Sequence, residues 1–166
     1  MDDLGGSELA ANGIDARLLD DRDGGVDLGF GLKWTGVAGA LDLELLADAT
    51  NTSGGQEVKL EYSYPISVGL GRLSPLGRHA WMSQDLANYT FGTLESEVAR
   101  GVVDYRPGST TTSQVGLTFA HPLSKQWFFV GSLRYSALPD KIRQSPLIED
   151  GVDGETSMML FFSRGL

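Results

Sequence analysis

The sequence predicts an all-β protein: a partial, antiparallel up-and-down transmembrane β-barrel of about seven strands, with one short helix in a long external loop. Three observations lead to this fold class. Apolar residues alternate with small or polar ones in runs of about ten residues, which is the length a tilted strand needs to cross a bilayer. Aromatic residues lie near the ends of these runs. The connections between the runs are alternately short and long, as in outer-membrane barrels.

The composition limits the possible functions. The chain has 166 residues, a formal net charge of −9 and no cysteine, so it has no disulfide framework and is a poor candidate for binding nucleic acid through phosphates. Residues 1–60 hold twelve acidic and four basic side chains, and the remainder holds ten and nine. We therefore divide the chain into an acidic external loop, residues 1–25, and a partial barrel, residues 26–166.

The start of the chain does not resemble a secretion signal. Residues 1–6 have neither a basic nor an apolar region, and no run of about 18 apolar residues occurs anywhere in the sequence. A barrel protein without a signal could not be exported. Three alternatives follow: a fragment, a misplaced start, or a soluble β-protein.

The first three strands are expected at residues 26–35, 41–49 and 57–66, where alternation is clearest. They are separated by a tight turn at Gly36–Gly39 and a polar turn at Asn51–Gly55. Pro65 is expected to end the third strand, because proline cannot donate to a β-ladder. A tight turn at Gly69–Gly71 follows.

The second half is less regular. A strand is expected at residues 72–83, although Pro75 and Gly77 leave its parity open. The long loop 84–110 is expected to hold a helix at residues 94–100, capped by Thr93. A hairpin at 114–138, a loop at 139–154 and a last strand from about Glu155 complete the chain.

The alternation assigns residues to two faces. Charged residues of one parity are candidates for lining a lumen: Asp27, Lys33, Asp42, Glu44, Asp48, Lys59 and Glu61, with Glu57 beside them. Apolar residues of the other parity are candidates for facing lipid: Leu28, Phe30, Trp34, Leu43, Leu60, Tyr62, Leu117, Phe119, Trp127 and Phe129.

Each face has more than one interpretation. A carboxylate-rich lumen favours cations, but salt bridges to arginines such as Arg72, Arg78 and Arg134 would fill the same space. The apolar parity suits lipid, and it equally suits the core of a soluble β-barrel that binds a small apolar ligand.

No catalytic or metal-binding arrangement stands out. His79 and Ser83, four positions apart on a strand, lie roughly 13 Å from each other, and His121 falls in a turn. The acidic turns at residues 20–24 and 150–154 lack the spacing of a calcium loop and its closing glutamate. We expect no enzyme activity, no cofactor and no metal site.

Several segments resemble one family in their order and spacing. They include Asn88–Gly92, Tyr105–Gly108 and Ser145–Ile148, together with Trp127 and the Arg134-Tyr135 pair. These residues resemble the long loop, the closing hairpin and the last loop of MipA/OmpV-type outer-membrane proteins. The family-like loop positions are Tyr89, Phe91, Gly92, Tyr105, Pro107, Gly108, Ser145 and Pro146.

The resemblance implies a barrel in the cell outer membrane, in contact with outer-membrane lipid. It also implies a scaffold that links a lytic transglycosylase to a penicillin-binding protein. The family's signal peptide and first strands have no counterpart here, so we expect the C-terminal portion of such a protein. Seven strands leave two edges, so this chain alone is expected to form an incomplete, curved sheet with its first and last strands unpaired on one side.

Overall fold

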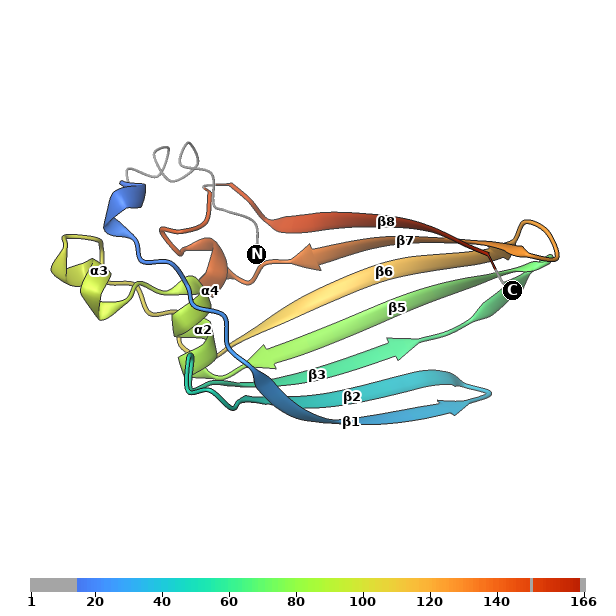
Figure 1. Cartoon of the computed structure of the whole chain (residues 1–166), viewed down its shortest axis with the longest axis horizontal. Helices are drawn as coiled ribbons and strands as arrows, with labels where there is room; N and C mark the ends of the chain where they lie inside the picture. The colour runs from blue at the N-terminus through green and yellow to red at the C-terminus, as the bar shows by residue number, and fades with distance from the viewer. Residues whose placement is uncertain (1–14, 150, 165–166) are drawn as a thin grey trace.

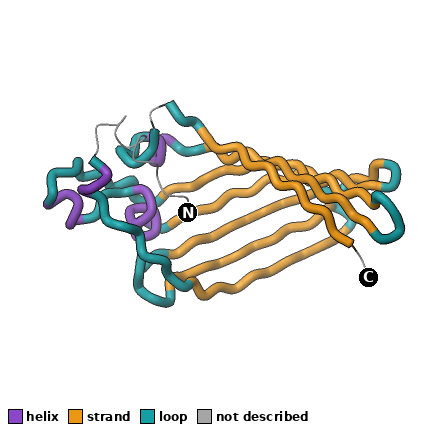
Figure 2. The backbone as a smooth tube through the Cα atoms, turned by 45° about the horizontal axis from the view of Figure 1, so that its top comes forward, coloured by secondary structure: helices purple, strands orange, loops and turns teal. Residues whose placement is uncertain are grey.

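The computed structural model describes residues 15–149 and 151–164. Its main feature is one long, curved antiparallel sheet with the helical segments gathered at one end (Figures 1 and 2). The strands are β1 (Asp27–Gly36), β2 (Gly39–Asp48), β3 (Gln56–Ser63), β4 (Ile66–Val68), β5 (Gly71–Met82), β6 (Thr110–Pro122), β7 (Trp127–Ala137) and β8 (Gly154–Arg164). The helical segments are η1 (Ala16–Leu18), α2 (Gln84–Phe91), α3 (Glu95–Ala99) and α4 (Asp140–Arg143).

Each long strand pairs with the next along the chain, in the order β1-β2-β3-β5-β6-β7-β8. This is the up-and-down arrangement that the sequence predicts. The end that carries residues 15–26, 49–55, 83–109 and 138–153 is called the loop end. The opposite end, formed by residues 37–38, 64–70, 123–126 and the end of β8, is called the turn end. Gly39, with φ of 112°, makes the tight turn between β1 and β2 possible.

The strand count needs one correction. Seven long strands lie where alternation places them, but the short strand β4 makes the sheet eight-stranded. Pro65 ends β3 as expected, and the chain then returns to the sheet to pair Ile66 with Leu73 and Val68 with Gly71. A proline interrupts a ladder locally because it removes one donor, and residues beyond it are free to pair again.

The expectation of one short helix in the long loop is wrong, because α2 precedes α3 there. Ser83 caps α2, since its hydroxyl accepts a hydrogen bond from the Leu86 amide. Thr93 does not cap α3, which begins after Leu94. Its hydroxyl accepts instead from the Tyr105 amide at 2.8 Å. At the start of α3 the Glu97 carboxylate, rather than the Thr93 hydroxyl, accepts the free Leu94 amide.

The sheet is open, as expected for seven long strands. Within the described residues, β1 pairs only with β2 and β8 only with β7. Both edge strands run from the loop end to the turn end (Figure 1). No helix in this part of the chain is long and apolar enough to cross a membrane.

Candidate functional site: two sheet faces and a loop cap

The register gives the sheet one apolar face. All ten residues proposed to face lipid lie on it, because cross-strand partners such as Trp34 and Leu41, or Leu117 and Leu133, share a side of the sheet. Many of them are open: Leu28 is 69% exposed and Leu60 is 43% exposed. No second sheet and no helix of the described residues covers this face (Figures 1 and 2). This amount of exposed apolar surface needs an apolar environment.

The apolar face has a regular height. On two strands, a polar residue at each end encloses three apolar positions of the same parity. The bounding pairs are Ser113 and His121 on β6 and Thr156 and Arg164 on β8. Each pair is eight positions apart, which is about 27 Å along a strand and about 21 Å across a membrane at a tilt of about 40°. Outer-membrane barrels have an apolar band about 25 Å tall.

The opposite face, called the polar face, carries every charged residue proposed to line a lumen. Several of these residues are paired with each other: Lys33 with Asp42 at 3.6 Å, and Lys59 with Glu57 at 2.9 Å and Glu44 at 3.7 Å. Asp48 has a different role. Its carboxylate accepts the Ser53 amide at 2.6 Å and folds the turn between β2 and β3.

One ion pair joins strands that are not neighbours. Glu61 on β3 lies 3.0 Å from Arg78 on β5 and 3.9 Å from Arg134 on β7. β3 and β7 are three strand spacings apart, about 14 Å along the sheet, and a sheet that curves towards its polar face brings these two side chains together. Gly116 leaves the space that Arg134 occupies, since a Cβ there would lie 3.0 Å from the arginine Cγ.

The polar face separates its charges. Strands β1–β3 place six carboxylates and two lysines on it, whereas β5–β7 place three arginines and no carboxylate there. Two of these arginines, Arg78 and Arg134, pair with Glu61. They are among the arginines that the sequence suggests as partners for the carboxylates. The boundary between the acidic and basic halves is the Glu61 cluster.

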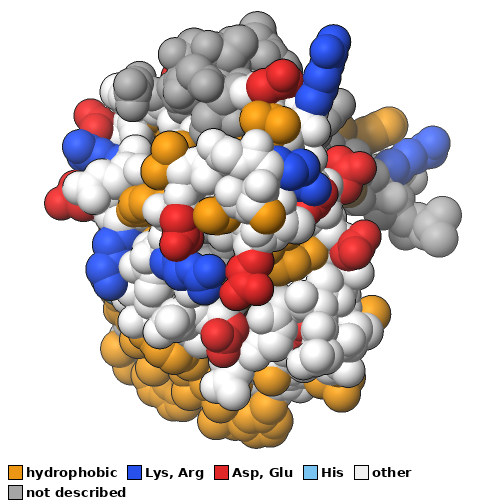
Figure 3. Space-filling view, turned by 90° about the vertical axis from the view of Figure 1, so that its left-hand side faces the viewer, with side chains coloured by type: hydrophobic (Ala, Val, Ile, Leu, Met, Phe, Trp, Pro, Cys, Tyr) orange, Lys and Arg blue, Asp and Glu red, His pale blue; other side chains and the backbone are white. Residues whose placement is uncertain are grey.

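The segments at the loop end pack into a compact unit, called here the loop cap. Figure 3 views it end on, with charged side chains of both signs across it and hydrophobic side chains gathered below. Its apolar centre contains Met82, Ala87 and Ile142, all buried, with Phe91 and Leu138 packed against them. Met82 belongs to the polar face, so the cap lies over that face rather than over the apolar one.

A buried ion pair fixes the N-terminal segment to the cap. Glu97 has no exposed surface, and its carboxylate lies 2.6 Å from the Arg22 guanidinium. The same carboxylate accepts the amides of Leu94 at 2.6 Å and Asp20 at 2.9 Å. Arg22 also donates to the Tyr89 and Gly92 carbonyls, each at 2.9 Å.

These contacts set the pKa of Glu97. Burial alone would raise it, but the hydrogen bonds from Arg22 and the two amides, together with the positive charge of Arg22, hold it below its ordinary value. Glu97 is therefore a carboxylate at neutral pH. The sequence places this residue in a short helix of the family-like loop, but it does not reveal the ion pair, because the partner is 75 positions away.

The family-like loop residues meet in this cap. The Ser145 hydroxyl donates to the Phe91 carbonyl at 2.6 Å, and the Gly108 amide donates to the Asn88 side chain at 3.0 Å. The Tyr105 hydroxyl donates to the Lys141 carbonyl at 2.6 Å. The Tyr105 and Ser145 bonds join the loop 83–109 to the loop 138–153, and the Gly108 bond lies within the first of these loops, so several of the family-like loop residues lie in one structural unit.

Other candidates offer little chemistry. His79 pairs with Ser113 at 2.9 Å rather than with Ser83, whose hydroxyl accepts the Gln56 amide. No carboxylate of the described residues orients that imidazole.

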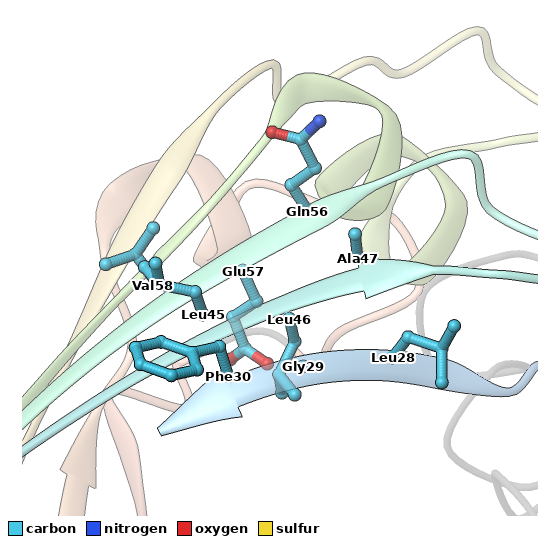
Figure 4. A pocket seen from close by; sticks show the side chains of 9 residues that line it. All are labelled: Leu28, Gly29, Phe30, Leu45, Leu46, Ala47, Gln56, Glu57 and Val58. Carbon is cyan, nitrogen blue, oxygen red and sulfur yellow. The ribbon is translucent and has the colours of Figure 1, made fainter. Parts of the chain in front are cut away.

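A shallow open hollow of about 470 Å³ lies over β1–β3 between Phe30 and Val58 (Figure 4). It is part of the exposed strand surface.

A curved antiparallel sheet with an uncovered apolar face, a charged concave face and long loops gathered at one end defines a barrel-type outer-membrane protein. The comparisons with known proteins agree. The profile of the family described as "MltA-interacting protein MipA" matches residues 3–164, and the chain belongs to this family. Its location is the outer membrane.

Two curated relatives are similar over most of this chain. "Putative outer membrane protein YiaT" of Escherichia coli (strain K12) is 26% identical over 132 residues, which are 79% of this chain and 54% of the relative. "MltA-interacting protein" of the same strain is 25% identical over 139 residues, 83% of this chain and 56% of the relative. The chain thus spans about half the length of the curated relatives it matches. No solved structure gives a significant match.

Proposed function

We propose that this chain forms part of the wall of a non-enzymatic outer-membrane barrel that serves as an interaction scaffold for murein-remodelling proteins. The proposed partners are a lytic transglycosylase and a penicillin-binding protein, and one relative is named for interaction with MltA. In this proposal the loop end, with residues 1–25 as an acidic external loop, faces outward. The turn end then faces the periplasm, where murein lies.

The observation that carries the proposal is the surface of the turn end. Each tight turn presents one protruding aliphatic side chain: Val37 is 102% exposed, Leu70 81% and Leu123 55%. Turn tips in water are normally polar, and exposed aliphatic groups at one end of a molecule are typical of protein interfaces. The proposed partner contacts these three tips.

The test is binding of the full chain, in detergent, to a purified MltA-type lytic transglycosylase and to a purified penicillin-binding protein. Replacing Val37, Leu70 and Leu123 with serine is expected to weaken binding about tenfold or more, because three apolar anchors are lost. Val103→Ser is the matched control, since Val103 is 70% exposed at the loop end. Equal binding of the triple variant and the control would remove the turn tips from the interface, and absence of any binding would end the scaffold proposal.

A passive cation-preferring channel is the second candidate, because six carboxylates line the polar face of β1–β3. Two features weigh against it: the loop cap lies over the polar face, and many of these charges are paired. Conductance in planar bilayers tests it, and a cation-selective current would favour the channel. A soluble barrel with an apolar ligand is not pursued, since the chain belongs to an outer-membrane family.

A further inference from the structure

The turn end carries positive side chains that form no ion pair with any described residue. They are Arg72, Lys125 and Arg164. The segments that build this end, 35–41, 63–73, 119–130 and 158–164, contain no Asp or Glu. A chain with a net charge of −9 therefore has a basic end. Uncompensated cations at one end attract an anionic ligand.

Arg164 has an unusual position. Its register partner is Trp127, which places it on the apolar face, where it is the only charged residue of the described strands. Its guanidinium lies 5.9 Å from the centre of the Trp127 ring, and one nitrogen lies 3.5 Å from the Gln126 side chain. A cation on a lipid-facing surface costs about 2–4 kcal/mol at mid-membrane and about 0–1 near the interface. Arg164 therefore marks the level at which lipid headgroups begin.

Two further features lie at the same corner. Lys125 is in the turn that leads into β7 and is exposed. Indole rings prefer the headgroup level of a membrane, and Trp127 is 45% exposed there. Just beyond them, Phe129 and Phe162 pack together on the apolar face with ring centres 5.2 Å apart. The corner thus joins two cations to a surface suited to acyl chains.

We propose that Lys125 and Arg164, beside Trp127, bind the phosphate of an anionic phospholipid whose acyl chains lie along β7 and β8. The planar guanidinium offers two parallel N–H donors to phosphate oxygens, and the lysine adds a second positive charge. A lipid is favoured over an acidic protein because Arg164 stands at the edge of the apolar band, beside Trp127, with Lys125 in the adjoining turn. That turn also carries Leu123, a proposed partner contact, so lipid binding and partner binding are tested separately.

The test uses the full chain in nanodiscs of phosphatidylcholine containing phosphatidylglycerol. Native mass spectrometry of the protein after release from the discs measures which lipid is retained. Wild type is expected to retain phosphatidylglycerol preferentially, and each cation removed should lower this enrichment about fivefold. The double variant Lys125→Gln/Arg164→Gln should therefore lose most of the preference. Arg17→Gln, which removes an exposed cation at the loop end, should not change it.

Further arms keep the result interpretable. Arg164→Lys retains the charge and should keep much of the enrichment, and circular dichroism checks that each variant keeps its strands. Equal retention of both lipids by wild type, or unchanged enrichment in the double variant, would overturn the proposal. So would loss of the enrichment on adding inorganic phosphate, which would indicate a phosphate site without lipid specificity.

A different result would assign the cations to a protein interface instead: weaker transglycosylase binding by the double variant, together with no lipid preference in wild type. Because the lipid assay contains no partner protein, its failure is separate from failure of the scaffold role.

Discussion

Replacing Glu97 with glutamine tests how the loop cap is held together. The change keeps the shape of the side chain and removes its charge, which leaves the Arg22 guanidinium, only 15% exposed, without its counter-ion. Removing one member of a buried ion pair costs about 3–5 kcal/mol. We expect the lower limit, about 3 kcal/mol, because Arg22 keeps its bonds to the Tyr89 and Gly92 carbonyls and the new amide oxygen can still accept hydrogen bonds.

The assay is hydrogen exchange of the amides in the cap, which reports local opening without unfolding the sheet. A loss of about 3 kcal/mol corresponds to exchange roughly 100-fold faster for the amides of Asp20 and Leu94. Glu95→Gln is the control, because Glu95 is 90% exposed and lies 3.7 Å from Arg106; an exposed pair contributes about 0–1 kcal/mol. If both variants exchange at similar rates, the buried pair does not hold the cap.

Three more predictions follow from the same structure. Because the pKa of Glu97 is lowered in the folded protein, its contribution to cap stability should be complete above its ordinary pKa of about 4.3 and disappear as pH falls through the lowered value; cap exchange in Glu97→Gln should lack this acid dependence. On β8, Met158→Arg places a charge on the apolar face and should cost about 2–4 kcal/mol of folding free energy in lipid vesicles, whereas its neighbour Ser157→Arg, on the polar face, should cost far less. Gly116→Val should cost about 1–3 kcal/mol in denaturant titrations by crowding a neighbouring arginine; Gly77→Val, where a Cβ meets no atom within 4 Å, should be tolerated.

Strand alternation was enough to predict most of the sheet, because one face of β1–β3 is apolar at nearly every position. Val26–Thr35 and Gln114–Ala120 alternate without interruption, and all of these residues except Val26 lie in long strands paired in the expected order. β5 could not be assigned a parity from its own residues. Its register depends on both neighbours, which align Arg78 with Glu61 and with Gln114. The pairing of β5 with its neighbours is tertiary structure, and the alternation within one segment does not encode it.

The loop cap was largely beyond sequence reasoning. Its stability depends on contacts between distant segments, such as Asp20 with Glu97 and Phe91 with Ser145, and no periodic pattern encodes them. The resemblance to a known family did name some of the positions that meet there, such as Phe91 and Ser145. The assignment of the polar face to a lumen and of the apolar face to lipid stays a prediction, since it depends on surroundings that lie outside this chain.

The most direct test of the central claim, that the apolar face meets acyl chains, is intrinsic fluorescence. The chain has three tryptophans, Trp34, Trp81 and Trp127, and all lie on the apolar face. With the full chain refolded into vesicles of phosphatidylcholine brominated along its acyl chains, we predict strong quenching of this fluorescence and little quenching by aqueous iodide. Fluorescence that iodide quenches and brominated chains do not would show that this face meets water or protein, and would contradict the account.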